Sequence, residues 1–92
     1  MNGGYILIDC TGLDLIKGST PQTISGLRSK VVTAMKTGKP IFAANCNWDG
    51  QLTNPLPVMA LKIGTDIICT ANTLQIYIDE SDVVTIVNLV GD

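Results

Sequence analysis

The sequence predicts an α+β domain in which one helix packs on a mostly antiparallel sheet. Three observations lead to this prediction. One segment has the pattern of an amphipathic helix, short apolar strands flank it on both sides, and the chain from Val58 onward alternates short apolar runs with turn residues. The predicted order is β-α-β followed by a β meander, in a single small domain over residues 1–92.

The first predicted strand covers residues 5–10 (YILIDC) and ends at the turn formed by Thr11 and Gly12. Both of its faces are apolar, so we expect it in the middle of the sheet. Residues 13–18 fit either a continued strand or a turn.

The helix is predicted to begin at residues 19–21 and to end at Gly38. Ser19 or Thr20 supplies the N-cap, and Gln22 completes a capping box with Ser19. One stripe of this helix is apolar and is expected to face the core; it consists of Ile24, Leu27, Val31, Ala34 and Met35.

The opposite face of the helix is small and mostly uncharged; it consists of Ser25, Gly26, Ser29, Thr33 and Thr37. Such a face is open either to solvent or to the close approach of a neighbouring chain. Gly26 in a helix interior costs about 1 kcal/mol relative to alanine.

Five further strands are predicted, over residues 41–45, 58–63, 67–70, 74–79 and 83–90. Alternation in LQIYID assigns Leu74, Ile76 and Ile78 to the core under the helix. One helix cannot cover both faces of such a sheet, so the other face meets solvent or another subunit. Candidates for an oligomer interface on that face are Tyr77, Val84, Ile86 and Val90, although a register shift of one residue would reverse these assignments.

The stretch NCNWDGQLTNPLP, residues 45–57, holds the one tryptophan of the chain. Most of its residues have structural explanations, since Asp49 and Gly50 form a turn and Cys46 continues the preceding strand toward the core. Trp48 either caps an edge of the core or anchors a partner. The candidates for a partner or ligand surface are Trp48, Asn47, Asp49 and Gln51.

Composition favours a self-associating protein. Hydrophobic residues make up 46% of the chain and charged residues 15%, against about 25% charged in an average domain. A short chain buries a limited share of its surface, so a homo-oligomer, trimer or dimer, is expected. The net charge of −2 indicates no nucleic-acid partner. Neither a signal peptide nor a membrane span is predicted, and we expect a soluble protein made in a bacterial cytoplasm.

The residues give no positive indication of catalysis. The chain has no histidine, and Asp9 and Cys10 point to opposite faces of their strand. The three cysteines, Cys10, Cys46 and Cys69, are spaced unlike a zinc site and are expected to be small buried hydrophobic residues. The acidic trio Asp79, Glu80 and Asp82 is expected to form a solvated turn. We therefore expect no enzyme activity, no metal and no cofactor.

The order of these pieces resembles bacteriophage and prophage virion proteins of the head-fibre or capsid-decoration kind, including the terminal modules of fibres. The strand YILIDCTGLDL, the segment QTISGLRSKVVTAMKTGKPIF, the loop NCNWDGQLTNPLP and the final VVTIVNLV carry the resemblance. It implies an oligomeric, non-enzymatic module in a virion, in contact with capsid or other virion proteins. The start at MNGG, without a repetitive shaft, favours an autonomous head or cement module or an excised domain over a full fibre.

Two function classes follow. The first is a structural virion module that self-associates. The second is a small binding domain that recognises a glycan, a peptide or a protein partner through the Trp48 loop.

Overall fold

A computed structural model describes residues 4–48, 50 and 52–88. Within these residues lie a 3-10 helix, an α-helix and seven strands: β1 (Ile6–Asp9), η1 (Leu15–Lys17), β2 (Gln22–Thr23), α1 (Leu27–Thr37), β3 (Ile41–Ala44), β4 (Leu56–Ile63), β5 (Asp66–Ala71), β6 (Leu74–Ile78) and β7 (Val83–Asn88).

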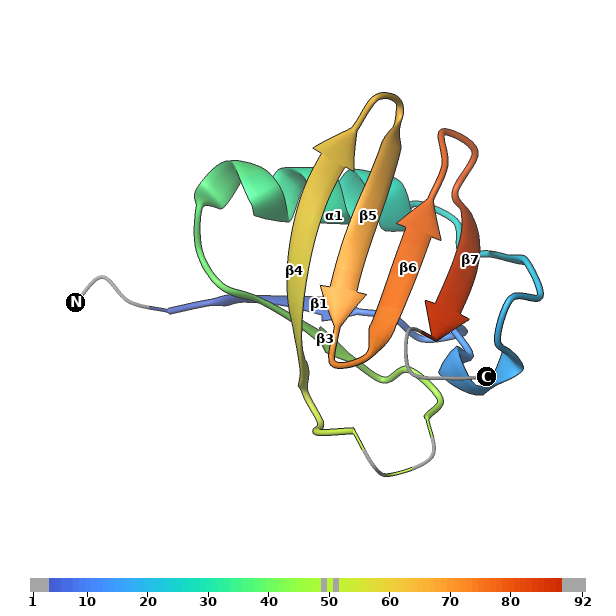
Figure 1. The fold of residues 1–92 in the computed structure, drawn as a ribbon. Helices are drawn as coiled ribbons and strands as arrows, with labels where there is room; N and C mark the ends of the chain where they lie inside the picture. Colours follow the sequence, from blue (N-terminus) through green and yellow to red (C-terminus); the bar gives the residue numbers. More distant parts are fainter. Residues whose placement is uncertain (1–3, 49, 51, 89–92) are drawn as a thin grey trace.

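The strands form a single curled sheet in the order β1-β3-β4-β5-β6-β7-β2. The pair β1 and β3 is parallel, and the other neighbours are antiparallel. Figure 1 shows α1 behind the meander of β4 to β7, while β1 and β3 cross it at a steep angle. The predicted α+β class, with one helix on a mostly antiparallel sheet, is confirmed in outline.

The place of the first strand was predicted wrongly. β1 is at one end of the sheet order and pairs with β3 alone among the described strands. Leu7 is 52% exposed, so the apolar character of this strand reflects an exposed outward face and not a central position.

The start of the helix was also predicted wrongly. Residues 19–25 are not helical, and Gln22 and Thr23 instead extend along β7 as β2. Pairing gives these residues backbone hydrogen bonds and gives β7 its second neighbour, which its two apolar faces require. Gly26 is the N-cap of α1 with φ 79°, a left-handed conformation that glycine adopts without strain.

A side chain from the other end of the sequence caps α1. The Asp82 carboxylate accepts the backbone N–H of Gly26 at 2.9 Å and that of Arg28 at 3.0 Å. The Arg28 guanidinium donates in turn to the carbonyl of Ile78 at 3.3 Å. The β6–β7 hairpin therefore satisfies donors that every helix N-terminus leaves unpaired.

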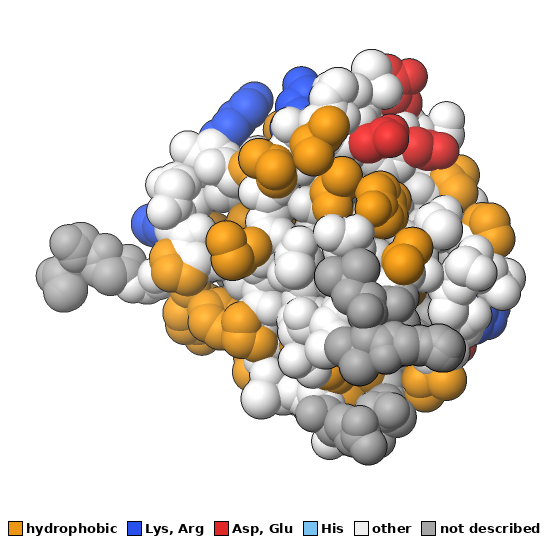
Figure 2. Space-filling model, viewed as in Figure 1, with side chains coloured by type: hydrophobic (Ala, Val, Ile, Leu, Met, Phe, Trp, Pro, Cys, Tyr) orange, Lys and Arg blue, Asp and Glu red, His pale blue; other side chains and the backbone are white. Residues whose placement is uncertain are grey.

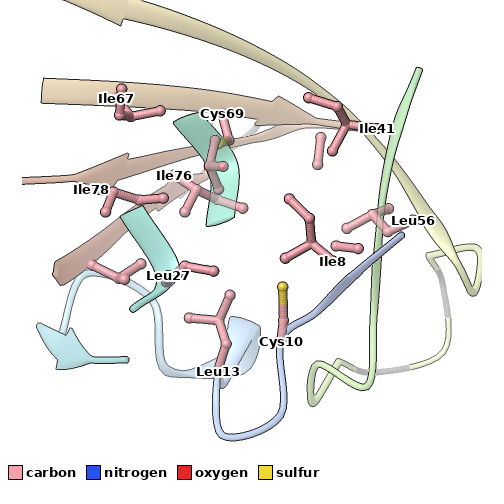
Figure 3. Packing of buried hydrophobic residues seen from close by; sticks show 14 of the residues in the cluster. Ile8, Cys10, Leu13, Leu27, Ile41, Leu56, Ile67, Cys69, Ile76 and Ile78 are labelled. Carbon is pink, nitrogen blue, oxygen red and sulfur yellow. The ribbon is translucent and has the colours of Figure 1, made fainter. Parts of the chain in front are cut away.

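The core lies between α1 and the concave side of the sheet (Figure 3). The predicted core residues Leu74, Ile76 and Ile78 are buried. Val84 and Ile86, predicted for the opposite face, are buried at 0% and 1% exposure, so that prediction is wrong.

Strand register explains the error. Ile86 pairs with Ile76 and Val84 pairs with Ile78, and directly opposed side chains in a sheet share a face. None of the described helices is long and apolar enough to cross a membrane.

Candidate functional site

The Trp48 loop is anchored by backbone pairing. Asn47 donates its N–H to the carbonyl of Leu13 at 2.9 Å and accepts from Leu15 at 2.8 Å. The Trp48 side chain is partly buried and packs against the hydrophobic core. Trp48 therefore covers an edge of the core. Asp49 and Gln51, the other two candidates in this loop, lie outside the described residues.

A polar cluster holds the end of β1 to the end of β3. Asp9 Oδ1 accepts from the Thr11 hydroxyl at 2.6 Å, from Asn45 Nδ2 at 2.9 Å and from the Thr11 backbone at 3.1 Å. The Thr11 hydroxyl, followed by Asn45, holds the pKa of the Asp9 carboxyl below its usual value. Asp9 is thus an ionised strand-end residue with its hydrogen bonds satisfied, as a structural role requires.

The cysteines are free thiols that behave as core residues. Cys10 and Cys69 are buried and Cys46 is partly buried. A hydrogen bond with Cys10 and then burial raise the pKa of the Cys46 thiol, and burial raises that of Cys69 to about 12. Thiolate nucleophiles need a lowered pKa, which Cys46 and Cys69 do not have. The hydrogen bond with Cys46 does lower the pKa of the Cys10 thiol, but Cys10 is buried in the core.

The part of the chain that the structure describes holds no group of three or more His, Cys, Asp or Glu side chains arranged to bind a metal. The acidic hairpin is not simply a solvated turn, because Asp82 caps α1 and Asp79 accepts from the backbones of Ser81 and Val83. A cavity of about 30 Å³ in the core is lined by apolar residues and has room for about one water molecule.

The feature that stands out is the convex side of the sheet, the face that α1 does not cover. We call it the outer face. Its apolar members, assigned by strand register and alternation, are Leu7, Phe42, Ala44, Pro57, Met59, Leu61, Ile63, Ile68, Tyr77, Val83 and Val87.

Three successive outward positions of β4 are the most exposed part of this face. Met59 is 78% exposed, Leu61 60% and Ile63 53%. A sheet with one wet face normally alternates apolar and polar residues, whereas β4 is apolar on its outward side from Pro57 to Ile63. This departure makes the outer face a candidate interaction surface.

Charge is nearly absent from the outer face. Among the residues that strand register places there, Asp9 and Asp66 carry charge, and both lie at strand ends. Figure 2 shows hydrophobic side chains spread over the face in view, with the charged side chains at its margin. Depletion of charge in the centre of a patch is typical of protein interfaces.

Of the predicted interface residues, Tyr77 lies on the outer face, where its hydroxyl donates to Gln75 Oε1 at 2.8 Å. Val90 lies outside the described residues. Met59, Leu61 and Ile63 were not among the candidates, although they occupy alternate positions of VMALKI and the intervening Val58 and Ala60 are also apolar. This run of apolar residues was the signal in the sequence that could have identified them.

No family model, no curated protein and no solved structure matches this chain.

Proposed function

We propose that this chain is a non-enzymatic structural protein that self-associates through its outer face. The observation that carries the proposal is the run of Met59, Leu61 and Ile63 on an uncharged sheet face. A second copy is the occupant that an apolar, self-complementary face fits best, because a symmetric dimer presents the same patch on both sides.

The area of the patch supports this occupant. Three aliphatic side chains on one side of β4, Met59, Leu61 and Ile63, are between 53% and 78% exposed and together present on the order of 400 Å² of surface, within the range of the largest patch on a monomer. A standard interface buries about 800 Å² per partner. The polar residues between these side chains supply the remainder.

The resemblance to phage head-fibre, decoration and fibre-end modules extends the proposal to a setting. In that setting the protein is made in a bacterial cytoplasm and joins a virion as a dimer or trimer that contacts capsid or other virion proteins. The low share of charged residues, 15% of the chain, agrees with such a role.

Light scattering coupled to gel filtration tests the self-association. The wild-type protein at low micromolar concentration should run as an oligomer, and Leu61→Lys should run as a monomer. Ile16→Lys is the matched control, since Ile16 is 59% exposed but lies in η1, away from the outer face. A monomeric wild-type protein, or equal loss of mass in both variants, contradicts the proposal.

The alternative function, recognition of a glycan, peptide or protein through the Trp48 loop, is less well supported because Trp48 packs against the core. Trp48→Ala should lower the melting temperature. An unchanged melting temperature together with loss of a binding partner would favour the alternative.

A further inference from the structure

Two of the three cysteines lie together where β1 and β3 end. Cys10 directly follows β1, Cys46 follows the end of β3 by two residues, and both line the apolar cavity in the core. We propose that Cys10 and Cys46 form a reversible disulfide bond when the protein meets hydrogen peroxide, and that this bond links the end of β1 to the end of β3. The modification lies within one chain and goes beyond the self-association proposed above.

The backbone holds the two residues at close range. β1 and β3 are parallel neighbours, and the N–H of Cys10 continues their pairing by donating to the carbonyl of Ala44 at 2.8 Å. The sulfur of Cys46 lies 4.0 Å from the same carbonyl oxygen. Neighbouring strands lie about 4.8 Å apart, which is within the range of about 4.4–6.8 Å between Cα atoms that disulfides bridge.

A left-handed residue turns the second thiol inward. Alternation from the buried Ala43 would place Asn45 inside and Cys46 outside. Asn45 instead has φ 66°, is exposed, and donates to Asp9 Oδ1 at 2.9 Å. This interruption of the strand lets Cys46 pack against the core. Figure 3 shows the sulfur of Cys10 pointing into the same core, so the two side chains converge.

The two thiols already contact each other. They share a hydrogen bond, which lowers the pKa of Cys10 and raises that of Cys46. Cys46 is thus the donor, and Cys10 is the sulfur on which a thiolate forms more readily. Peroxides oxidise thiolates. Because Cys46 is partly exposed, a small oxidant reaches the pair from its side.

The reaction needs no group other than the two thiols and peroxide. The Cys10 sulfur takes one oxygen atom as the O–O bond of peroxide breaks, and the other oxygen leaves as water. The Cys46 sulfur then attacks the sulfenic acid formed on Cys10, the S–O bond breaks, the S–S bond forms and a second water leaves. The two sulfurs together lose two electrons, which the peroxide gains. A dithiol reductant reverses the bond by exchange.

Cys69 lines the same cavity but is placed differently. It lies on β5, opposite Ala60 of β4 and Ile76 of β6, and β3 and β4 separate β5 from β1 in the sheet. Burial, followed by the charge of Cys10, raises the pKa of Cys69 to about 12. A neutral thiol is a poor target for peroxide, so we expect Cys69 to stay reduced.

The bond should stabilise the fold. It closes the chain from residue 10 to residue 46 into a loop that contains η1, β2, α1 and β3. A disulfide acts largely by restricting the unfolded chain, and more so when the closed loop is long. We expect the oxidised protein to melt about 10 °C above the reduced protein.

Oxidation of the full chain by equimolar hydrogen peroxide, followed by alkylation in denaturant, tests the pairing. Trypsin separates the three cysteines into different peptides, because lysines lie between them. Mass mapping should find the Cys10 and Cys46 peptides joined and Cys69 alkylated, while a denaturing gel without reductant shows a single chain. A bond that includes Cys69, a bond between two chains, or three alkylated cysteines would overturn the proposal.

A matched pair of variants tests the link between bond and stability. Cys46→Ala should abolish the bond and the gain in melting temperature on oxidation, whereas Cys69→Ala should retain both. Each variant is compared with its own reduced form, so that the cost of the substitution itself does not enter. Dithiothreitol should return the oxidised wild-type protein to the lower melting temperature. Equal responses in the two variants, or an oxidised wild-type protein that melts no higher than the reduced one, would contradict the proposal.

Discussion

The Asp82 carboxylate lies 3.0 Å from the backbone nitrogen of Arg28, although 54 residues separate them in the sequence. A loop at the tip of one hairpin thereby caps the only α-helix in the described residues. No local N-cap side chain does this work, because Gly26 occupies the N-cap position.

Replacing Asp82 should loosen the helix without disturbing the hairpin turn. Asp82 has φ 64°, which asparagine tolerates, so Asp82→Asn isolates the loss of charge and of one acceptor oxygen. We expect the melting temperature to fall by roughly 5 °C. Glu80→Gln removes the same charge from the same hairpin and should leave the melting temperature nearly unchanged. Equal effects in both variants would mean that the cap contributes nothing.

Stability should fall in acid. Backbone hydrogen bonds from Gly26 and Arg28 hold the pKa of Asp82 below 3.8, and Thr11 with Asn45 does the same for Asp9. A lowered pKa in the folded state stabilises the fold above the unfolded value, and this contribution is lost as the pH falls below 3.8 through the folded values. Urea unfolding at pH 7, 5 and 3 should show the loss below pH 4. Asp82→Asn should lose less over that range, and an unchanged pH profile would contradict the assignment.

The register of β7 can be read from two neighbouring substitutions. Ile86 is 1% exposed and Val87 39% exposed. Ile86→Ala should reduce the free energy of unfolding by about 2–5 kcal/mol, and Val87→Ala by less than about 0.5 kcal/mol. Urea unfolding of dilute protein, which keeps self-association from contributing, gives both numbers. A larger loss of unfolding free energy for Val87→Ala than for Ile86→Ala would indicate the other register, which places Ile86 on the outer face.

Substitution of Gly26 distinguishes two positions for the helix start, because alanine would stabilise the protein in one case and destabilise it in the other. In a helix interior, Gly26→Ala would stabilise the protein by about 1 kcal/mol. At φ 79° an alanine is strained, so we expect destabilisation by about 1 kcal/mol. Gly26→Asn should cost less, because asparagine enters the left-handed region more readily. Stabilisation by alanine would show that α1 begins before this residue.

The thiol of Cys69 should resist alkylation while the protein is folded. Burial raises its pKa from 9.0 to about 12, so the thiolate fraction at pH 8 falls on the order of a thousandfold. Iodoacetamide labelling followed by peptide mass mapping should find Cys69 unmodified in the native protein and modified in urea. Labelling at similar rates in both states would contradict its burial.

The meander was predictable because its signals are local. Alternation in residues 74–79 placed Leu74, Ile76 and Ile78 correctly in the core. Residues 83–90 are apolar at nearly every position, and their alternation could not decide the face. Val84 and Ile86 were therefore assigned to the wrong side, since the pairing with β6 that orients them is a tertiary contact.

The errors at the N-terminal end have a similar cause. Ser19 and Gln22 have the spacing of a capping box, but the competing backbone bonds to β7 are not visible in the local sequence. The cap that replaces the box comes from Asp82, far along the chain. Likewise, the apolar outward face of β1 fits either a central strand or an exposed edge, and the sheet order alone distinguishes them.

The candidate surfaces were anticipated in part. An uncovered sheet face follows from having one helix for many strands, but its centre on Met59, Leu61 and Ile63 depends on the register of β4. The Trp48 loop drew attention through its rare residues, and its pairing with Leu13 and Leu15 explains it as a packed edge.

β1 and β2 are close in sequence yet form opposite ends of the sheet. The segment up to Thr23 therefore supplies the two edge strands that cover β3 and β7. Cleavage after this segment would uncover both sides at once, and each newly bare strand could recruit another molecule. The first quarter of the chain thus keeps β3 and β7 from becoming the edges of the sheet.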